Sequence, residues 1–251
     1  MLEQLSAEDF IYATPKGHTF KHQPTSSEVI KTIKKQSDKV LLSFSTGKDS
    51  IIAWLAIRDH FEVHPFYLYV IPDLEFIDNT LAYYEKFFHA KIPRYPNVTA
   101  VSMLNSELFQ PPHRRSIISS MGLPEPTFDE IRKEACEDFK IPLDTWYASG
   151  VRASDSLNRR ASFRVHGPFT NTKKCFYPVW DVRKCGLTKM IELSGIKLPI
   201  DYWLFGKSFD GLDFRFLYPL KKYFPRDYQK ILELYPLAEL EIWRYEKYGK
   251  K

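Results

Sequence analysis

Serine, threonine, glycine, lysine and aspartate stand together at one point of the chain, directly after an apolar run. Residues 39–44 have the composition of a short buried strand, and residues 50–60 have the apolar pattern of a helix. The stretch between them contains Ser45, Thr46, Gly47, Lys48, Asp49 and Ser50. Short side chains let backbone N–H groups approach a phosphate closely, and the positive end of the following helix favours an anion. The residue types therefore predict a phosphate-binding loop.

Two charged residues extend the chemistry of this loop. Lys48 supplies a mobile cation, and Asp49 can orient the loop or a metal-bound phosphate. Gly-Lys-Asp-Ser also occurs in ordinary turns, and it is the strand and helix on either side that favour a phosphate site. The loop is not of the better-known ATPase type, because that type needs a glycine five residues before the Gly-Lys pair, where this chain has Leu42.

A second set of candidate phosphate ligands follows residues 145–148, which also have the composition of a strand. Gly150 permits a tight turn at the end of this strand. Arg152, Arg159 and Arg160 can reach a phosphate or sulfate with their forked donors. The alternative is that two of these three arginines are ordinary surface charges. Ligands bind beyond the carboxyl ends of parallel strands, so both sets are expected at one reaction centre.

Strands and helices alternate along much of the chain. Strands are expected at residues 39–44, 65–71, 98–101 and 145–148, and helices at residues 50–60, 79–89 and 127–139. Another helix is expected after Thr25, whose spacing to Glu28 is that of a capping box. The alternation predicts an α/β fold with a doubly wound, mostly parallel, Rossmann-like sheet. The proline-rich residues 111–126 are interpreted as an inserted lid or loop.

Three parts are expected along the chain: an N-terminal arm at residues 1–24, a nucleotide-binding α/β domain at residues 25–184, and a helical C-terminal extension at residues 185–251 that forms a cap. The aromatic residues between 202 and 218 are interpreted as the core of this cap, and a surface for a protein or nucleic-acid partner is the alternative.

The composition excludes several classes of protein. A hydrophobic content of 44% and an aromatic content of 16% exclude a disordered chain. No apolar run approaches the ~20 residues of a membrane helix, and the polar first residues do not form a secretory signal. Three cysteines without a dense framework are typical of the cytoplasm. A net charge of +5 is mild, so the basic clusters are interpreted as solvated faces, with an anionic ligand or nucleic acid permitted.

The loop at Ser45 to Ser50 resembles the SxGxDS loop of the PP-loop ATP pyrophosphatase superfamily. Within it, the chain is most similar to phosphoadenosine phosphosulfate (PAPS) reductase-like proteins and to the small subunit of bacterial ATP sulfurylase. Residues 72–76, 149–160 and 176–181 resemble, in order, the family's acidic segment, its G-x-R stretch and its Pro-x-x-Asp/Asn-Trp element. The likeness spans residues 39–182 and implies an adenine nucleotide alpha-hydrolase-like fold.

The resemblance also implies a reaction. ATP is attacked at its α-phosphate, an adenylylated acceptor forms and pyrophosphate leaves, with Mg²⁺ bridging the phosphates, in sulfur or nucleic-acid modification metabolism. The residues implied as catalytic are Lys48, Asp49, Arg152 and Arg159. Those implied as nucleotide ligands are Ser43, Ser45, Thr46, Gly47, Lys48, Asp49, Ser50, Asp73, Gly150, Arg152 and Arg160. Those implied as Mg²⁺ ligands are Asp49, Asp73 and Glu75. Adenine is expected in preference to guanine, beside the apolar strand ends.

The chain also departs from the family pattern. PAPS reductases carry a nucleophilic cysteine near the C-terminus, and residues 243–251 contain none. Cys136, Cys175 and Cys185 have no Cys-x-x-Cys spacing, so an iron–sulfur cluster is not expected. Two alternatives stay open beside the enzyme: a non-catalytic nucleotide-binding module, and a sulfonucleotide reductase without the usual cysteine. Trp180 is interpreted as core or as a cofactor platform, and Asp181 as a cap of the following helix or a ligand contact.

Overall fold

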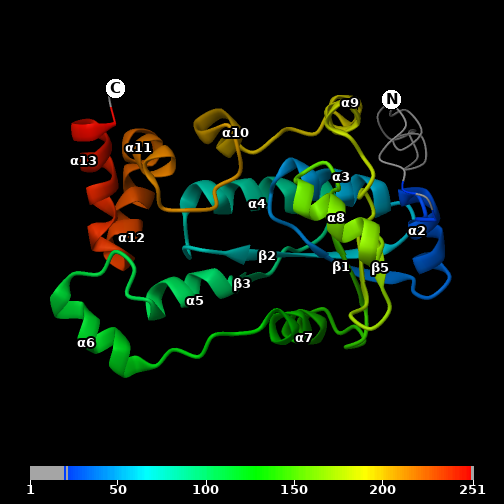
Figure 1. The fold of residues 1–251 in the computed structure, drawn as a ribbon, viewed down its shortest axis with the longest axis horizontal. Coiled ribbons are helices and arrows are strands. Elements are labelled where there is room, and N and C mark those ends of the chain that lie inside the picture. Colours follow the sequence, from blue (N-terminus) through cyan, green and yellow to red (C-terminus); the bar gives the residue numbers. More distant parts are fainter. Residues whose placement is uncertain (1–19, 21, 250–251) are drawn as a thin grey trace. The chain divides into compact units, whose positions relative to one another are not determined.

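Six strands form a single sheet in the computed structural model, which describes residues 20 and 22–249 (Figure 1). The strands are β1 (Lys39–Ser43), β2 (Glu62–Tyr69), β3 (Arg94–Pro96), β4 (Trp146–Ser149), β5 (Phe169–Thr170) and β6 (Cys175–Phe176). Their order is β3-β2-β1-β4-β6-β5. β1 pairs in parallel with β2 and β4, and β4 pairs in parallel with β6, whereas β5 runs antiparallel to β6. The predicted α/β fold with a mostly parallel sheet is confirmed.

Helices connect these strands and make up the C-terminal part of the described chain (Figure 1). Before β4 they are α2 (Ser26–Lys34), α3 (Lys48–Ile57), α4 (Glu75–Phe88), α5 (Val98–Asn105), α6 (Pro112–Met121) and α7 (Phe128–Asp138). After β4 they are α8 (Leu157–His166), α9 (Lys184–Ser194), α10 (Ile200–Phe205), α11 (Phe214–Tyr223), α12 (Pro225–Leu234), the 3₁₀ helix η1 (Pro236–Ala238) and α13 (Glu239–Tyr248). Among the described residues, no helix is both long enough and apolar enough to cross a bilayer.

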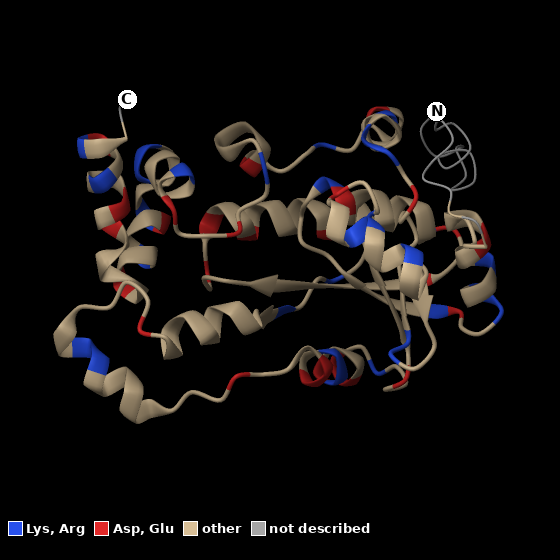
Figure 2. Ribbon diagram, viewed as in Figure 1, with Lys and Arg blue, Asp and Glu red and all other residues tan. Residues whose placement is uncertain are grey.

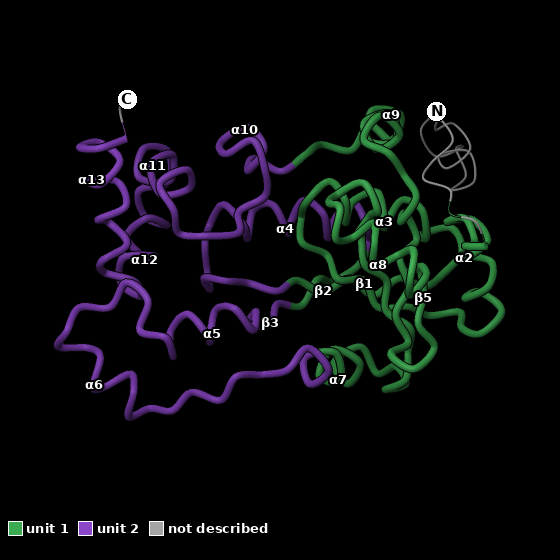
Figure 3. Tube along the Cα trace, in the orientation of Figure 1, with its two compact units in different colours: residues 1–67, 90–93, 132–198 green, residues 68–89, 94–131, 199–251 purple. Residues whose placement is uncertain are grey.

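The chain forms two compact units, each assembled from segments distant in sequence (Figure 3). Unit 1 contains the described residues up to Tyr67, together with Ala90–Pro93 and Arg132–Leu198. Unit 2 contains Leu68–His89, Arg94–Ile131 and the described residues from Pro199 onward. The expected boundary at residue 184 falls at the first residue of α9, inside unit 1. All but a few residues of the expected N-terminal arm, 1–24, lie outside the described residues.

The core of unit 1 is built on β1 and α3. Val40, Leu41 and Leu42 are fully buried in β1, and every residue of α3 from Ser50 to Ile57 is buried. A helix that is apolar on all sides must be covered on all sides, and α3 packs against β1 and β4 on one side and against α9. This packing fixes the start of α3, and with it the loop between β1 and α3.

The core of unit 2 is aromatic. Phe76 of α4 lies with its ring centroid 5.6 Å from that of Phe209, and Phe216 of α11 lies 5.4 Å from Phe209. The predicted aromatic segment therefore supplies core side chains. It also leaves Trp203 and Tyr218 exposed.

Two local predictions are wrong. Residues 98–101 are not a strand, because they form the first turn of α5, whose N-cap Asn97 accepts the backbone N–H of Thr99 at 2.9 Å. The strand in this region is β3, immediately before that cap. A short β-branched run fits a strand or a helix by periodicity, and the cap selects the helix. Within residues 111–126, helix α6 replaces much of the expected loop.

Candidate nucleotide-binding site

The sheet has its switch point between β1 and β4. From β1 the chain proceeds to β2 on one side, while β4 lies on the other, and ligands of open α/β sheets bind beyond the strand ends at such a point. A cavity of about 380 Å³ lies there, walled by the loop after β1 and the loop after β4. It is lined by Ser43, Ser45, Asp49, Ser50, Ser149, Gly150, Val151, Asp155 and Arg159. Some members of each predicted set of phosphate ligands therefore line the same cavity.

The phosphate loop is held by its own hydrogen bonds. Ser50 Oγ donates to the Gly47 carbonyl at 2.8 Å and accepts the Ser45 backbone N–H at 3.2 Å. Thr46 adopts a positive φ of 59°, which is uncommon for a β-branched residue, and its hydroxyl donates to the Ser45 carbonyl. These contacts hold the loop in a defined conformation.

Helix α3 begins two residues earlier than predicted, at Lys48. Its N-cap is Gly47, which has extended backbone angles and provides no side-chain hydrogen bond to the helix. Lys48 and Asp49 therefore lie in the first turn, where the helix dipole favours an anion. The N-terminus of α3 thus combines two properties of an anion site: oriented peptide dipoles and no side-chain cap from Gly47.

Gly150 brings the two loops into contact. A Cβ atom at this position would lie 2.4 Å from the Asp49 carbonyl oxygen and 2.8 Å from the Ser50 backbone nitrogen. The sequence predicts glycine here for a tight turn, but the structural reason is the close approach of two backbones. Only glycine permits this approach without displacing the phosphate loop.

A buried arginine lies beneath the cavity wall. Arg152 is 6% exposed, and its Nη2 atom lies 2.8 Å from Asp49 Oδ1 and 2.9 Å from Asp155 Oδ1. The contact with Asp49 is an ion pair without hydrogen-bond alignment, and Asp49 Oδ1 has no hydrogen-bond partner among the described residues. Burial raises the pKa of the Asp49 carboxyl, and the charge of Arg152 opposes that rise.

Helix α8 brings two further arginines near the site. Its N-cap Ser156 accepts the backbone N–H of Arg159 at 3.1 Å, and further basic residues follow along the helix (Figure 2). Arg159 and Arg160 are both exposed. Arg159 lines the cavity and Arg160 does not. Arg159 is thus the arginine whose charge faces the cavity.

Sequence and structure agree on part of the cavity lining. The predicted residues that line it are Ser43, Ser45, Asp49, Ser50, Gly150 and Arg159. Thr46, Gly47, Lys48, Arg152 and Arg160 are close by in the chain but do not line it. Three further lining residues were not predicted as ligands: Ser149, Val151 and Asp155. Asp155 could have been identified from the sequence, because it is an acidic residue three positions after Arg152 in the same loop.

Asp73 and Glu75, the other predicted metal ligands, belong to unit 2 and do not line this cavity. The Asp73 carbonyl accepts a hydrogen bond from Lys230, and the Glu75 backbone N–H donates to Asp227 Oδ1 at 2.8 Å. The Phe76 backbone N–H donates to the other oxygen of Asp227 at 3.0 Å. The Asp227 carboxylate therefore caps the N-terminus of α4 at this turn, and Lys230 lies beside it.

Trp180 and Asp181 have structural contacts. Trp180 is 1% exposed, stacks on Phe20 and donates from Nε1 to the Pro24 carbonyl at 3.0 Å, so it belongs to the core. Asp181 does cap a helix, but not the one that follows it. Its carboxylate accepts the backbone N–H of Ser26 at 3.2 Å and also the Ser26 hydroxyl, at the start of α2.

Two of the three cysteines are buried. Cys136 and Cys175 are buried, and burial raises the pKa of both thiols. Cys185 is exposed, at the second residue of α9. A raised pKa keeps a thiol protonated and weakly nucleophilic, so the two buried cysteines are packing residues.

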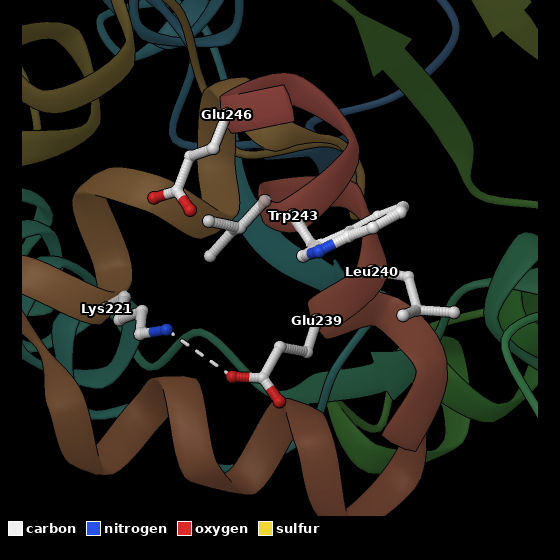
Figure 4. A pocket seen from close by; sticks show the side chains of 6 residues that line it. Lys221, Glu239, Leu240, Trp243 and Glu246 are labelled. Atoms are coloured by element: carbon white, nitrogen blue, oxygen red, sulfur yellow. Dashed lines mark hydrogen bonds and ion pairs between the residues drawn. The ribbon is translucent and has the colours of Figure 1, made fainter. Parts of the chain in front are cut away.

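Unit 2 contains a second cavity, of about 370 Å³, between α11 and α13 (Figure 4). Trp243 and Leu240 contribute apolar surface, and Glu239 and Glu246 contribute carboxylates. Lys221 Nζ lies 3.4 Å from Glu239 Oε1 and partly neutralises it. The unit 1 cavity, by contrast, adjoins the N-terminus of α3, where the helix dipole favours an anion, so it is the candidate nucleotide site.

No family model matches the chain, and no curated protein matches it. Among solved structures, the chain is similar to the NH3-dependent NAD synthetase from Campylobacter jejuni subsp. jejuni NCTC 11168 in complex with the nitrate ion. The two chains are 12% identical, the match covers 90% of this chain and 95% of that chain, and the TM-score is 0.42. A likeness of this degree says nothing about what this chain binds, so the candidate site is defined by the residues around the cavity.

Proposed function

We propose that this protein is a PP-loop enzyme of the PAPS reductase-like type that binds ATP or a related adenine nucleotide. It cleaves the nucleotide between the α- and β-phosphates and transfers the adenylyl group to an acceptor. One observation carries the proposal: the loop after β1 and the loop after β4 wall a single cavity at the switch point of the sheet. Helix α3, without a side-chain cap from Gly47, begins at that cavity.

The position of each residue determines its role in the proposed reaction. Ser45, Gly47, Lys48 and Ser50 bind the pyrophosphate at the N-terminus of α3 through hydroxyls, backbone N–H groups and the ammonium. Arg159 faces the cavity from α8 and stabilises the charge that develops on the leaving group. No covalent intermediate with the protein is required, because phosphoryl chemistry depends mainly on positioning and charge stabilisation.

The donor atoms at the cavity fit Mg²⁺. The ion prefers oxygen ligands, and in nucleotide sites it is held by one or two carboxylates together with phosphates and water. The carboxylates of Asp49 and Asp155 line the cavity, as do several serine hydroxyls. Within the described residues there is no set of three acidic, histidine or cysteine side chains that could hold an ion alone. Asp49 and Asp155 are the residues that would hold Mg²⁺, and the ion would supply neutralisation of phosphate charge.

Asp73 and Glu75 are left out of the proposed metal site. Both stand at the start of α4, where the helix dipole is positive and Lys230 donates to the Asp73 carbonyl. A cation is disfavoured in such surroundings.

Two measurements test the function. Isothermal titration of the full chain with Mg·ATP and Mg·GTP is expected to show tighter binding of ATP, and equal affinities would contradict the superfamily assignment. Incubation with α-labelled ATP and candidate acceptors is expected to yield AMP or an adenylyl adduct with pyrophosphate. ADP and free phosphate as sole products would refute the proposed cleavage position. Binding of ATP with no product for any acceptor would favour the non-catalytic module.

A sulfonucleotide reductase remains the weaker alternative. It would need a reactive thiol at the nucleotide, and no cysteine lines the unit 1 cavity. Reduction of PAPS or adenylylsulfate by the protein, with a thiol donor supplied, would favour it.

A further inference from the structure

Arg152 carries a guanidinium group and yet is nearly inaccessible to solvent. Its side chain is 7% exposed. A buried cation is tolerated only when it is paired and hydrogen-bonded. One terminal nitrogen, Nη2, pairs with Asp49 and Asp155, and the other, Nη1, donates to the Val182 carbonyl at 3.3 Å. These contacts connect the first turn of α3, the loop after β4 and the segment after β6.

Asp155 fixes the guanidinium relative to the backbone. Its Oδ1 pairs with Arg152 Nη2 at 2.9 Å, and its Oδ2 accepts the Arg152 backbone N–H at 2.7 Å. The carboxylate thus holds the arginine at both ends. The Ser154 hydroxyl donates to the Val182 carbonyl at 3.1 Å, the same oxygen that accepts from Arg152. The loop after β4 is therefore held by internal contacts between Arg152 and Asp155 and by contacts with the segment after β6. The contact with Asp49 is additional to these.

The contrast with Arg159 separates two roles. Arg159 is exposed and lines the cavity that the phosphates would occupy. Arg152 does not line the cavity, and its terminal nitrogens are directed at two carboxylates and a carbonyl. The sequence groups both arginines as phosphate ligands, because it shows neither burial nor pairing.

We propose that Arg152 is a positioning residue that does not touch phosphate. Together with Asp49 and Asp155 it forms a carboxylate clamp, which holds Asp49 on the cavity wall and so keeps the phosphate loop in its binding conformation. The clamp rests on the proposed function for the identity of the ligand. Its effect on the loop does not depend on any ligand, and this allows the two ideas to be tested separately.

Amide hydrogen exchange of the full chain tests the clamp without ligand. Arg152→Gln and Asp155→Asn are each expected to speed exchange of residues 45–50 by about tenfold, because local opening of the loop becomes easier. Asp155→Asn is needed because Arg152→Gln leaves two carboxylates without their cation and can prevent folding. Arg183→Gln removes an exposed arginine next to Val182 and is expected to leave exchange unchanged. Wild-type exchange in Asp155→Asn would overturn the proposal.

A double-mutant cycle with ATP and Mg²⁺ tests whether Arg152 acts through Asp49. Arg152→Gln is expected to weaken binding by about tenfold in the wild-type background and by less than about twofold in the Asp49→Asn background, since coupled residues are not additive. Arg159→Gln is expected to weaken binding equally in both. Equal losses for Arg152→Gln in the two backgrounds would show direct phosphate contact and overturn the proposal. If the wild-type protein binds no ATP, the proposed function fails, and the exchange measurement decides the clamp.

Discussion

Two helices start directly beyond neighbouring parallel strands, and their N-termini are used differently. Helix α3 follows β1 in unit 1, and helix α4 follows β2 and lies in unit 2. Neither N-cap residue, Gly47 or Leu74, provides a side-chain hydrogen bond. At α4, the first backbone N–H groups donate to the buried carboxylate of Asp227. At α3, the corresponding end adjoins a cavity whose polar lining consists of serines, two aspartates and Arg159.

The comparison shows that a helix N-terminus after a parallel strand is not in itself an anion site. Both helices have a dipole whose positive end lies at the N-terminus, and the first N–H groups of each need acceptors from outside the helix. In unit 2 the protein supplies the anion itself, from α12, and Lys230 lies 3.9 Å from Asp227 Oδ1 as its counter-ion. In unit 1 the space beyond the helix remains free for a ligand. The predictions below test this difference between the two ends.

The largest effect is expected for Asp227→Ala. The substitution leaves the backbone N–H groups of Glu75 and Phe76 without their acceptor, next to a vacated space. Loss of a cap costs up to about 2 kcal/mol, and each unsatisfied buried group about 1–3 kcal/mol, so we expect the free energy of unfolding to fall by about 3 kcal/mol. Urea unfolding followed by tryptophan fluorescence measures it. The control, Asp129→Ala, changes an exposed aspartate in the first turn of α7, and an equal loss in both variants would contradict the capping role.

Gly150→Ala is expected to affect both stability and binding. The new Cβ would overlap the Asp49 carbonyl, so the phosphate loop must move. Overpacking of this kind costs about 2 kcal/mol, and ATP binding is expected to be lost with the loop geometry. The control is Gly211→Ala, whose Cβ would meet only the Phe216 side chain, at 3.6 Å. Tight ATP binding by Gly150→Ala would show that the backbone contact is not required.

Lys48→Ala is expected to weaken ATP binding by about tenfold, which corresponds to about 1.4 kcal/mol, because a cation at the open helix end is lost. Its stability should change by no more than about 0.5 kcal/mol, as for most surface substitutions. Asp49→Ala should also weaken Mg·ATP binding, but at a greater cost in stability, since Arg152 loses a partner. Titration calorimetry with ATP and Mg²⁺ measures both, with exposed Lys189→Ala as the control. Wild-type affinity in both variants would refute the phosphate-loop assignment.

The smallest effect is expected for Asp201→Asn, a second buried aspartate of unit 2. Burial raises the pKa of the Asp201 carboxyl, although the Phe209 backbone N–H donates to its Oδ2 at 2.9 Å. The folded protein therefore binds a proton more tightly than the unfolded chain, and stability falls as the pH rises from about 3.8 through the folded pKa. Asp201→Asn removes this penalty and keeps an acceptor for Phe209.

Urea unfolding at several pH values checks that sign. At neutral pH the variant should be more stable than the wild type, and below pH 3.8 the difference should vanish. A difference that does not depend on pH would contradict the assignment. Asp129→Asn, at an exposed position, is the matched control. The result would refine the comparison of helix ends. It distinguishes the buried carboxylate of Asp227, which caps a helix, from that of Asp201, which has one oxygen without a hydrogen-bond partner.

The sequence by itself determined the features that depend on neighbours along the chain. The apolar run of β1, the serine- and glycine-containing loop and the apolar residues 51–57 of α3 follow one another in the chain, so strand, loop and helix could be predicted together. The capping box of α2 is another case, since Thr25 and Glu28 exchange hydrogen bonds as their spacing predicts. Periodicity alone was ambiguous at residues 98–101, where the cap at Asn97 decided for a helix. The very short β5 and β6 had no periodic signal.

Only the tertiary structure decided which polar side chains remain available to a ligand. Asp227 caps a helix that starts 152 residues before it, and Asp181 caps one 155 residues before it. Arg152 and Asp49 form an ion pair between two loops, which removes Arg152 from the set of phosphate ligands we propose. The physical reason is common to these cases: a charged group is buried only with a partner, and folding chooses that partner from any part of the chain. Residue type and spacing indicate which chemistry is possible. Burial and pairing decide which side chains remain available for it.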